Sequence, residues 1–189
     1  MSSEAMHSYE KKAGEKKTRL ADSPQCERVF ISIGSNEGEK HLNVCGAIDA
    51  LGLLDVTEIK SVSSLYRTEP CGHVSDSWFI NCVVELKTML PPLELLDRVE
   101  EIEVNLGRKN KRGNEPRSVD LDIVLYGDLI VRFPRLCVPH PRMAKRRFVL
   151  EPLAEIAPNV VHPLLKSTAS DLNSKTLGQK VFREELYNA

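Results

Sequence analysis

The stretch FINCVVELKTMLPPLELLDRVEEIEVNLG, residues 79–107, decides the fold because it predicts a strand followed directly by a helix. The apolar side chains of residues 79–88 alternate, as is typical of a strand, and one face is formed by Ile80, Cys82, Val84 and Leu86. The dipeptide Pro91-Pro92 suits the first turn of a helix. That helix ends at Gly107 and carries one apolar stripe, formed by Leu95, Val99, Ile102 and Leu106.

The residues before this stretch predict a similar pair of elements. Residues 29–33 alternate as a strand buried on both faces and end at the turn of residues 34–38. A helix that stops at Gly52 follows from the apolar spacing of Val44, Ile48 and Leu51. Residues 56–67 are rich in β-branched side chains, which favours a second strand with room for a bulge.

The residues after it complete the pattern. Residues 118–126 predict a fourth strand, whose buried face is formed by Val119, Leu121, Ile123 and Leu125. Residues 136–153 predict a Pro-rich turn and a helix, and after Pro163 only one short helix is predicted. The order strand, helix, strand, strand, helix, strand is that of a ferredoxin-like α+β sandwich, here with an added C-terminal helical and loop segment. We expect its helices to cover one sheet face and the other face to be left for loops and ligands.

Composition along the chain divides it into three parts. Residues 1–28 are polar and without periodicity, which predicts a disordered arm, and they lack the features of a signal or transit peptide. Residues 29–163 form the predicted domain and residues 164–189 a C-terminal extension. No apolar run approaches the roughly 18 residues of a spanning helix, so we expect a cytoplasmic protein without a membrane partner.

The five cysteines fit the same compartment. Their spacing matches no zinc motif, and their number is odd. Cys45 and Cys82 have apolar neighbours in the sequence, so we expect both to be buried, reduced thiols.

The formal net charge of −1 hides two opposed blocks. Residues 29–107 carry 5 basic and 13 acidic side chains, a net of −8, whereas residues 108–147 carry 11 basic and 4 acidic ones, a net of +7. The balanced total excludes a protein that binds nucleic acid through bulk positive charge. A basic block within the domain instead predicts an anionic ligand.

Two aspartates stand inside the basic block. Asp120 and Asp122 are two residues apart on the predicted fourth strand, so both project from the face opposite Leu121, roughly 6.6 Å apart. Carboxylates so placed suit one or two Mg²⁺ ions, although ordinary solvated acids on an exposed strand give the same pattern. Basic residues flank the pair, as a polyphosphate bound with Mg²⁺ requires, although a solvated basic loop is the alternative: Arg108, Lys109, Lys111, Arg112, Arg117, Arg142, Lys145, Arg146 and Arg147.

Three other side chains have both a structural and a functional interpretation. His140, in a Pro-flanked turn, is either structural or a donor to a phosphate. Phe79 and Phe148 suit the core, yet Phe79 shares the outward face of its strand with Asn81, so that a flat ring could stack on one and hydrogen-bond the other. The sequence contains no Walker P-loop, serine-hydrolase elbow or zinc-protease motif.

Over residues 29–163 the chain resembles the 6-hydroxymethyl-7,8-dihydropterin pyrophosphokinase family of folate biosynthesis. The motifs that carry the resemblance keep their order along the chain: Ile33-Gly34-Ser35-Asn36-x-Gly38, Ser64-Leu65-Tyr66-Arg67-Thr68-Glu69-Pro70-x-Gly72, Phe79-x-Asn81, Glu103-x-x-x-Gly107-Arg108, Pro116-Arg117-x-x-Asp120-Leu121-Asp122-Ile123, Val138-Pro139-His140-Pro141-Arg142-Met143 and Arg147-Phe148-Val149-Leu150-x-Pro152-Leu153.

The resemblance implies an ATP-dependent transfer of pyrophosphate to the pterin hydroxymethyl group, with AMP released. Asp120 and Asp122 would hold two Mg²⁺ ions. The pterin ring would be sandwiched between Phe79 and Phe148. Its polar edge would form hydrogen bonds with Asn81 and with the backbone from Thr68 through Pro70 to Gly72. Contacts to the triphosphate would come from Arg108, Arg117, His140 and Arg146, with Arg108 and Arg117 also catalytic. Glu103, Ile123 and Arg135 would lie near the nucleoside. Some members are fused to dihydropteroate synthase, which implies functional coupling to that enzyme.

The chain departs from the family in the basic loop. Asn114 and Glu115 stand where many members have an aromatic residue and glycine, and Asn110 stands where a second arginine often lies. The loop is also one residue shorter. The resemblance implies that this loop closes over the site, so we expect the changes to affect closure and turnover more than binding.

Two other functions suit a ferredoxin-like fold. A nucleotidyl transferase or cyclase also uses paired strand carboxylates and two metals, but would release pyrophosphate. A non-catalytic nucleic-acid module would need aromatic side chains on the central strands. The fourth strand offers only Tyr126 there, beside two aspartates, so we expect no nucleic-acid partner.

Overall fold

The computed structural model describes residues 26–70, 77–107, 118–176 and 178–184. Strand β1 (Glu27–Ser35) pairs with β4 (Phe79–Thr88) on one side and with β5 (Asp120–Tyr126) on the other. The sheet has the order β5-β1-β4-β3-β8, all its pairs are antiparallel, and β2 (Thr57–Val62) also pairs with β4. Helix α2 (Lys40–Gly52) connects β1 to β2, and α3 (Pro92–Asn105) connects β4 to β5. This is the predicted ferredoxin-like α+β arrangement.

The predicted second strand is split in two. Residues 56–67 form β2 and the short β3 (Tyr66–Thr68), and the register against β4 shifts between Ile59 and Ser61. At the break Ser63 still binds β4: its backbone N–H donates to the Val83 carbonyl at 2.9 Å, and its hydroxyl accepts from the Val83 N–H at 3.0 Å. A side chain thus takes over part of the ladder, and the strand can bend without leaving Val83 unsatisfied.

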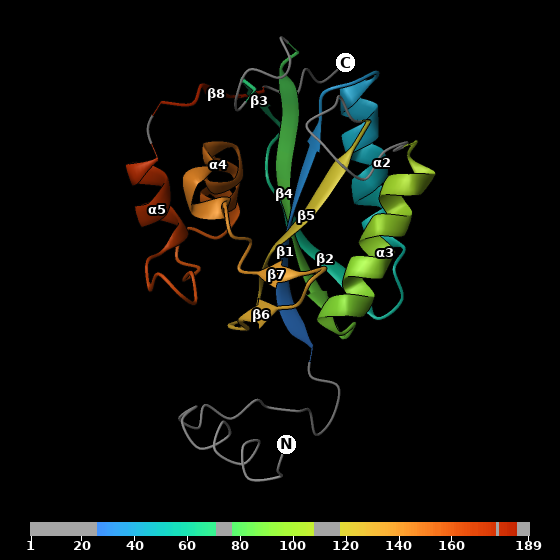
Figure 1. The fold of residues 1–189 in the computed structure, drawn as a ribbon. Helices are drawn as coiled ribbons and strands as arrows, with labels where there is room; N and C mark the ends of the chain where they lie inside the picture. The colour runs from blue at the N-terminus through green and yellow to red at the C-terminus, as the bar shows by residue number, and fades with distance from the viewer. Residues whose placement is uncertain (1–25, 71–76, 108–117, 177, 185–189) are drawn as a thin grey trace, which may run out of the picture.

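Two apolar cores lie on opposite faces of the sheet. Figure 1 shows α2 and α3 on one side of the sheet and α4 and α5 on the other. The larger lies between the sheet and helices α2 and α3, and its strand residues include Ile31, Ile33, Val84 and Leu86. The second lies under α4 (Arg147–Ile156), and its strand residues are Phe30, Val83, Val124 and Leu125. The expectation that this second face is left for loops and ligands is therefore wrong, because α4 covers part of it; we call it the α4 face.

A bulge in β5 also corrects the expected pattern of faces. Phe30 pairs with Leu125 and Ile31 with Ile123, so Val124 is an extra residue in the ladder. Val124 and Leu125 consequently both pack under α4, whereas Leu125 was expected to share the face of Leu121. Beyond the bulge Tyr126 turns into the larger core, 3% exposed, and its hydroxyl donates to the Leu90 carbonyl.

The segment after β5 returns along the edge of the sheet. Strands β6 (Val131–Arg132) and β7 (Cys137–Val138) form a two-stranded ladder, and the His140 N–H donates to the Val124 carbonyl at 3.0 Å. A 3₁₀ turn, η1 (Met143–Lys145), then leads into α4. These contacts place residues 140–148 beside β5.

The C-terminal extension contains one expected and one unexpected element. Helix α5 (Ala169–Lys175) packs on α4 and begins with a capping box, in which Thr168 and Asp171 exchange side-chain and backbone hydrogen bonds. Strand β8 (Val181–Arg183) pairs with β3 at the far edge of the sheet, where the sequence predicted no strand.

The cysteines differ in part from expectation. Cys82 is fully buried in the larger core, and burial raises the pKa of its thiol to about 12. Cys45 is exposed, contrary to expectation, because α2 turns Val44, Ala47 and Leu51 toward the sheet instead. Within the described ranges no helix has the length and apolar content needed to cross a membrane.

Candidate active site

The two aspartates project from β5 on the α4 face, since Leu121 between them enters the opposite core. Each is half-buried. Asp122 Oδ2 accepts a hydrogen bond from Arg146 Nη1 at 3.2 Å and lies 3.7 Å from His140 Nε2. Strand β5 and the segment of residues 140–148 therefore meet at the acidic pair.

The cations at this cluster are partly removed from water. Burial lowers the pKa of His140, and the charges of Arg146 and Arg142 lower it further, against the opposing effect of Asp122. Burial also lowers the pKa of Arg146, while the Asp122 carboxylate acts to raise it. The half-buried Arg146 guanidinium is paired with the half-buried Asp122 carboxylate, so the two charges offset each other; an anionic ligand could bind the guanidinium in place of the carboxylate.

Arg146 links the acidic pair to an aromatic ring. Its guanidinium carbon lies 5.3 Å from the ring centroid of Phe148, at the first turn of α4. Phe148 is half-buried. An ion-paired charge and a partly open aromatic face thus lie side by side, as a ligand with both a phosphate and a flat ring would need.

A row of three residues crosses the sheet next to this ring. Gly34 on β1 pairs with Asn81 on β4 and with Asp120 on β5. Strand spacing puts the Cα atoms of Asn81 and Asp120 about 10 Å apart on the α4 face. A Cβ at Gly34 would meet Asn81 Oδ1 at 2.6 Å, so the glycine leaves the space between these two polar side chains open.

Asn81 is held in one orientation. Its Nδ2 donates to the Thr68 hydroxyl on β3 at 2.7 Å, and both side chains are buried, at 3% and 1% exposure. This fixes the side-chain amide, with Oδ1 toward Gly34 as an acceptor. Phe79, the first residue of β4, and Pro70, two residues after β3, are both half-buried.

The loop after β1 is tied to the start of β4. Lys40 Nζ donates to the Ser77 hydroxyl at 2.9 Å and to the Trp78 carbonyl at 2.7 Å, and Ser77 donates to the Asn36 carbonyl at 3.0 Å. Neither Gly34 nor Lys40 was predicted as a site residue. The motif containing Gly34 was the available signal, whereas Lys40 belongs to no motif.

Glu103 supports β5 from α3. The side chain is 3% exposed, and its Oε1 accepts from the Leu121 backbone N–H at 2.8 Å, between the two aspartates. The carboxylate therefore satisfies an edge-strand donor and orients the residues on either side of it. This contact is of a different kind from the nucleoside contact that the resemblance implies.

The remaining candidates lie apart from this cluster. Arg135 is exposed and pairs with Asp97 at 2.7 Å and Glu100 at 3.1 Å, both on α3. Ile123 is 4% exposed in the larger core. Three predicted site residues lie outside the described ones: Gly72, Arg108 and Arg117.

The donor set fits a cation that shares its ligands with a substrate. Among the described residues no group of three or more His, Cys, Asp or Glu side chains is arranged to hold a metal ion. Asp120 and Asp122 offer carboxylate oxygens from one strand face. Mg²⁺ is commonly held by one or two carboxylates, with phosphate oxygens and water as its other ligands.

Comparison with known proteins agrees with this geometry. A family described as 7,8-dihydro-6-hydroxymethylpterin-pyrophosphokinase (HPPK) matches residues 30–158. The 2-amino-4-hydroxy-6-hydroxymethyldihydropteridine pyrophosphokinase of Pseudomonas aeruginosa is 42% identical over 137 residues, 72% of this chain and 85% of its own length. The Bacillus subtilis protein of the same name is 41% identical over 132 residues, 70% of this chain and 79% of its own.

Solved structures show the same fold. The wild-type Plasmodium falciparum HPPK-DHPS chain crystallised with SDX-DHP superposes with a TM-score of 0.65 at 16% identity, over 85% of this chain. The match spans 46% of the Plasmodium chain, so this chain corresponds to less than half of that protein. From the matched family and the curated relatives together, the chain belongs to the 7,8-dihydro-6-hydroxymethylpterin-pyrophosphokinase family.

Proposed function

We propose that this pyrophosphokinase transfers pyrophosphate from ATP to the hydroxymethyl oxygen of 6-hydroxymethyl-7,8-dihydropterin and releases AMP. One observation carries the proposal: Asp122, Arg146 and Phe148 form a continuous chain of contacts from a carboxylate to an aromatic ring. A phosphate group bound at Arg146 would therefore lie next to a flat ring bound at Phe148. The printed names of the relatives agree with this substrate class.

The pterin ring would lie on the α4 face between Phe148 and Phe79. Asn81 Nδ2 already donates to Thr68, so Oδ1 is the atom that would accept a hydrogen bond from a pterin N–H. The backbone from Thr68 to Gly72 would contact the polar edge of the ring. Recognition by hydrogen bonds to a buried amide gives strong discrimination, because a ring without the matching donor leaves that amide unsatisfied.

The triphosphate would lie over the acidic pair. Asp120 and Asp122 would hold two Mg²⁺ ions, which when bound supply positive charge against the phosphate oxygens. Arg146 and His140 flank Asp122, and we assign both to the phosphates together with Arg108 and Arg117. Glu103, Ile123 and Arg135 remain candidates for the nucleoside end, of which Glu103 also orients the Leu121 backbone.

The reaction needs no covalent enzyme intermediate. The hydroxymethyl oxygen forms a bond to the β-phosphorus, the bond from that phosphorus to the bridging oxygen of the α-phosphate breaks, and AMP leaves. The hydroxyl proton passes to solvent. Asn81 and the two rings position the nucleophile, and the arginines stabilise charge on the transferred group, so catalysis rests on orientation and electrostatics.

The proposal is tested by incubating the protein with ATP, Mg²⁺ and 6-hydroxymethyl-7,8-dihydropterin and measuring AMP. We expect AMP and the pterin diphosphate in equal amounts, and no AMP when the pterin or Mg²⁺ is left out. Free pyrophosphate in place of AMP would indicate the nucleotidyl transferase or cyclase instead. The nucleic-acid module loses its one aromatic candidate, since Tyr126 is buried.

The wider setting forms part of the same proposal. We assign the enzyme to the cytoplasm, with residues 29–163 as the pyrophosphokinase domain. Coupling to dihydropteroate synthase is supported by the Plasmodium falciparum HPPK-DHPS chains and is testable by co-purification of the two enzymes from the source cells.

A further inference from the structure

The extension after α4 returns to the site and contacts Glu69 there. The Glu69 N–H donates to the Lys180 carbonyl at 3.1 Å, and the Lys180 N–H donates to Glu69 Oε1 at 2.8 Å. Gln179 Nε2 donates to the Glu69 carbonyl at 3.0 Å. Glu69 lies between Thr68 and Pro70, both assigned to the pterin, so the extension holds this segment by three hydrogen bonds.

The side-chain oxygen of Gln179 binds the backbone of Phe148. Gln179 Oε1 accepts from the Phe148 backbone N–H at 3.2 Å, in the first turn of α4. The N–H groups of a first turn have no partner within their helix, and the N-cap residue Arg146 makes no side-chain capping bond. Gln179 therefore caps α4 from 31 residues away.

An amide can make both bonds, because its oxygen accepts and its nitrogen donates. A carboxylate would place negative charge against the Glu69 carbonyl, and an apolar side chain would make neither bond. The half-buried Gln179 thus fixes the separation between the ring of Phe148 and the segment from Thr68 to Pro70.

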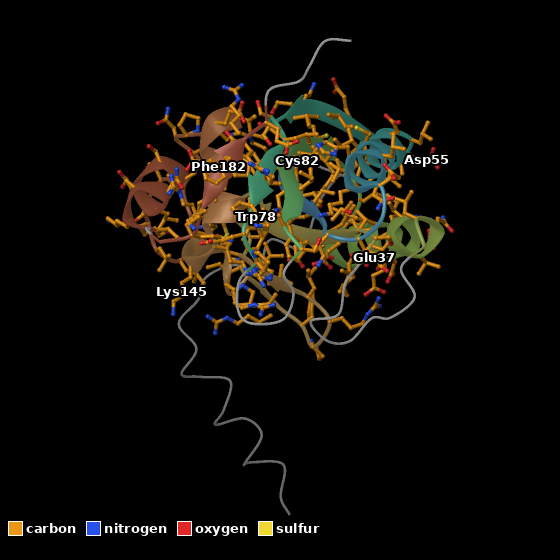
Figure 2. The ribbon with its side chains drawn as sticks, turned by 90° about the horizontal axis from the view of Figure 1, so that it is seen from above. Glu37, Asp55, Trp78, Cys82, Lys145 and Phe182 are labelled. Atoms are coloured by element: carbon orange, nitrogen blue, oxygen red, sulfur yellow. The ribbon has the colours of Figure 1, made fainter. Side chains whose placement is uncertain are left out.

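Strand β8 also contacts the residue just before β4, the strand that carries Phe79 and Asn81. The ring of Phe182 stacks on that of Trp78, with centroids 5.8 Å apart; both residues are labelled in Figure 2. The guanidinium of Arg67 lies over both rings, 5.4 Å from the centroid of Trp78 and 5.9 Å from that of Phe182. Trp78 directly precedes Phe79. The extension therefore contacts the segment from Thr68 to Pro70 as well as the residue that directly precedes Phe79.

We propose that Gln179 is a positioning residue that sets the width of the pterin slot by bridging Phe148 and Glu69. The proposal rests on the proposed function, since it assumes that these segments bind the pterin. It assigns a role in substrate affinity to a residue beyond the part matched by the family, residues 30–158.

The test compares Gln179→Met with the wild type in the AMP-release assay. Loss of two hydrogen bonds that shape a binding slot is expected to raise the pterin KM by about three- to tenfold, with the ATP KM unchanged. Gln179→Glu keeps the acceptor for Phe148 but places a carboxylate against the Glu69 carbonyl, so its pterin KM should rise at least as much as that of Gln179→Met. Hydrogen exchange of the Phe148 amide should be faster in Gln179→Met and close to wild type in Gln179→Glu.

Thr168→Ala is the matched control, because it weakens α5 of the same extension without touching the slot. It should lower Tm and leave the pterin KM unchanged. An unchanged pterin KM in Gln179→Met, or an equal rise in Thr168→Ala, overturns the positioning role. A wild-type protein that releases no AMP and binds no pterin by calorimetry overturns the proposed function, and this inference with it.

Discussion

Asp122 shows how one side chain combines several demands on the site. Its carboxylate binds Arg146 and lies near His140. These contacts offset the cost of holding a half-buried negative charge beside Asp120, because each places a polar or cationic group against it. In the proposed reaction the same arginine would exchange this carboxylate for a phosphate oxygen, so the pair keeps Arg146 in place before ATP binds.

Asp120→Asn and Asp122→Asn should each remove most turnover while the fold survives. The expected loss of kcat is at least about 100-fold, because an amide cannot supply the negative charge that holds the metal. Tm should change by only a few degrees, since both side chains are half-exposed. The measurement is AMP release at saturating substrates together with thermal unfolding. Near-normal rates in both variants would rule out the two-metal assignment.

Gly34→Ala should impair pterin binding through Asn81. The new Cβ would lie 2.6 Å from Asn81 Oδ1, so the amide must shift away from the bond it makes with Thr68. We expect pterin affinity to fall about tenfold or more, with a loss of about 1–3 kcal/mol in the free energy of unfolding. Calorimetry and denaturant unfolding measure the two effects.

Gly46→Ala is the matched control for this substitution. Gly46 lies in the interior of α2. A Cβ at this position would meet Leu106 Cδ2 at 3.4 Å, and the side chain of Leu106 is flexible enough to adjust. Alanine favours a helix interior over glycine by about 0.5–1 kcal/mol, so Gly46→Ala should be neutral to stabilising and bind pterin normally. Equal pterin affinity in the two variants would contradict the role given to Gly34.

At the level of elements, Glu155 joins three of them. From α4 its carboxylate accepts from the Ser64 N–H at 2.9 Å, the Ser64 hydroxyl at 2.7 Å and the Tyr66 hydroxyl at 3.1 Å. Arg183 of β8 lies 3.0 Å from it. The same cluster raises the pKa of Tyr66 to about 12, mainly through burial and then through the hydrogen bond to Glu155. Helix α4, β3 and β8 therefore depend on one ionised group.

Glu155→Gln should lower Tm at neutral pH and not at low pH. Burial acts to raise the pKa of Glu155, but the bonds from Ser64 and Tyr66 outweigh it, so that the net pKa is lowered. A carboxylate whose folded pKa is lowered stabilises the fold above its unfolded pKa, and this contribution is lost as pH falls through the folded value. The difference in Tm between wild type and variant should therefore shrink below about pH 4.

Thermal unfolding across pH 3–8 is the measurement, with Glu58→Gln as the control. Glu58 is exposed on β2 and pairs only with the side chain of Lys60 among the contacts of the described residues, so its substitution should have little effect at any pH. A Tm difference for Glu155→Gln that stays constant over this range would contradict the assigned role of ionisation.

Elements were predictable where the signal is local and periodic. Residues 79–88 form β4 as predicted. Of the four residues in the predicted stripe, Leu95, Val99 and Ile102 are buried in α3, and Leu106 is half-buried at its C-cap. Strand β8 was missed because three residues carry no period and pair with β3, more than 100 positions earlier. The bulge at Val124 depends on register against β1, which local alternation does not contain.

The candidate site divides in the same way. That Asp120 and Asp122 project from the same face of β5 follows from strand alternation and was predicted. The contacts of Arg146 with Asp122, of Gly34 with Asn81 and of Gln179 with Phe148 depend on which segments the sheet brings together, so no local pattern indicates them. The assigned roles of these residues toward substrate stay predictions.

For the molecule as a whole, the second core contains residues from both sides of the domain boundary that the sequence predicts at residue 163. Ala169 and Leu172 of α5 are 2% and 8% exposed and pack against the same cluster as Leu150 and Leu153 of α4. The extension is thus part of the packing that holds α4 on the sheet. Since α4 carries Phe148, stability and substrate binding are both linked to residues beyond the predicted domain.

Two truncations separate these contributions. A chain ending at Pro163 exposes the apolar surface that Ala169 and Leu172 cover, worth about 3–4 kcal/mol, so Tm should fall by about 10 °C. A chain ending at Thr176 keeps α5 and removes Gln179 and β8; it should lose only a few degrees but show a raised pterin KM. Thermal unfolding and AMP release measure both chains. If the chain ending at Pro163 melts with the full-length protein, the second core does not cross the boundary in the way these contacts require.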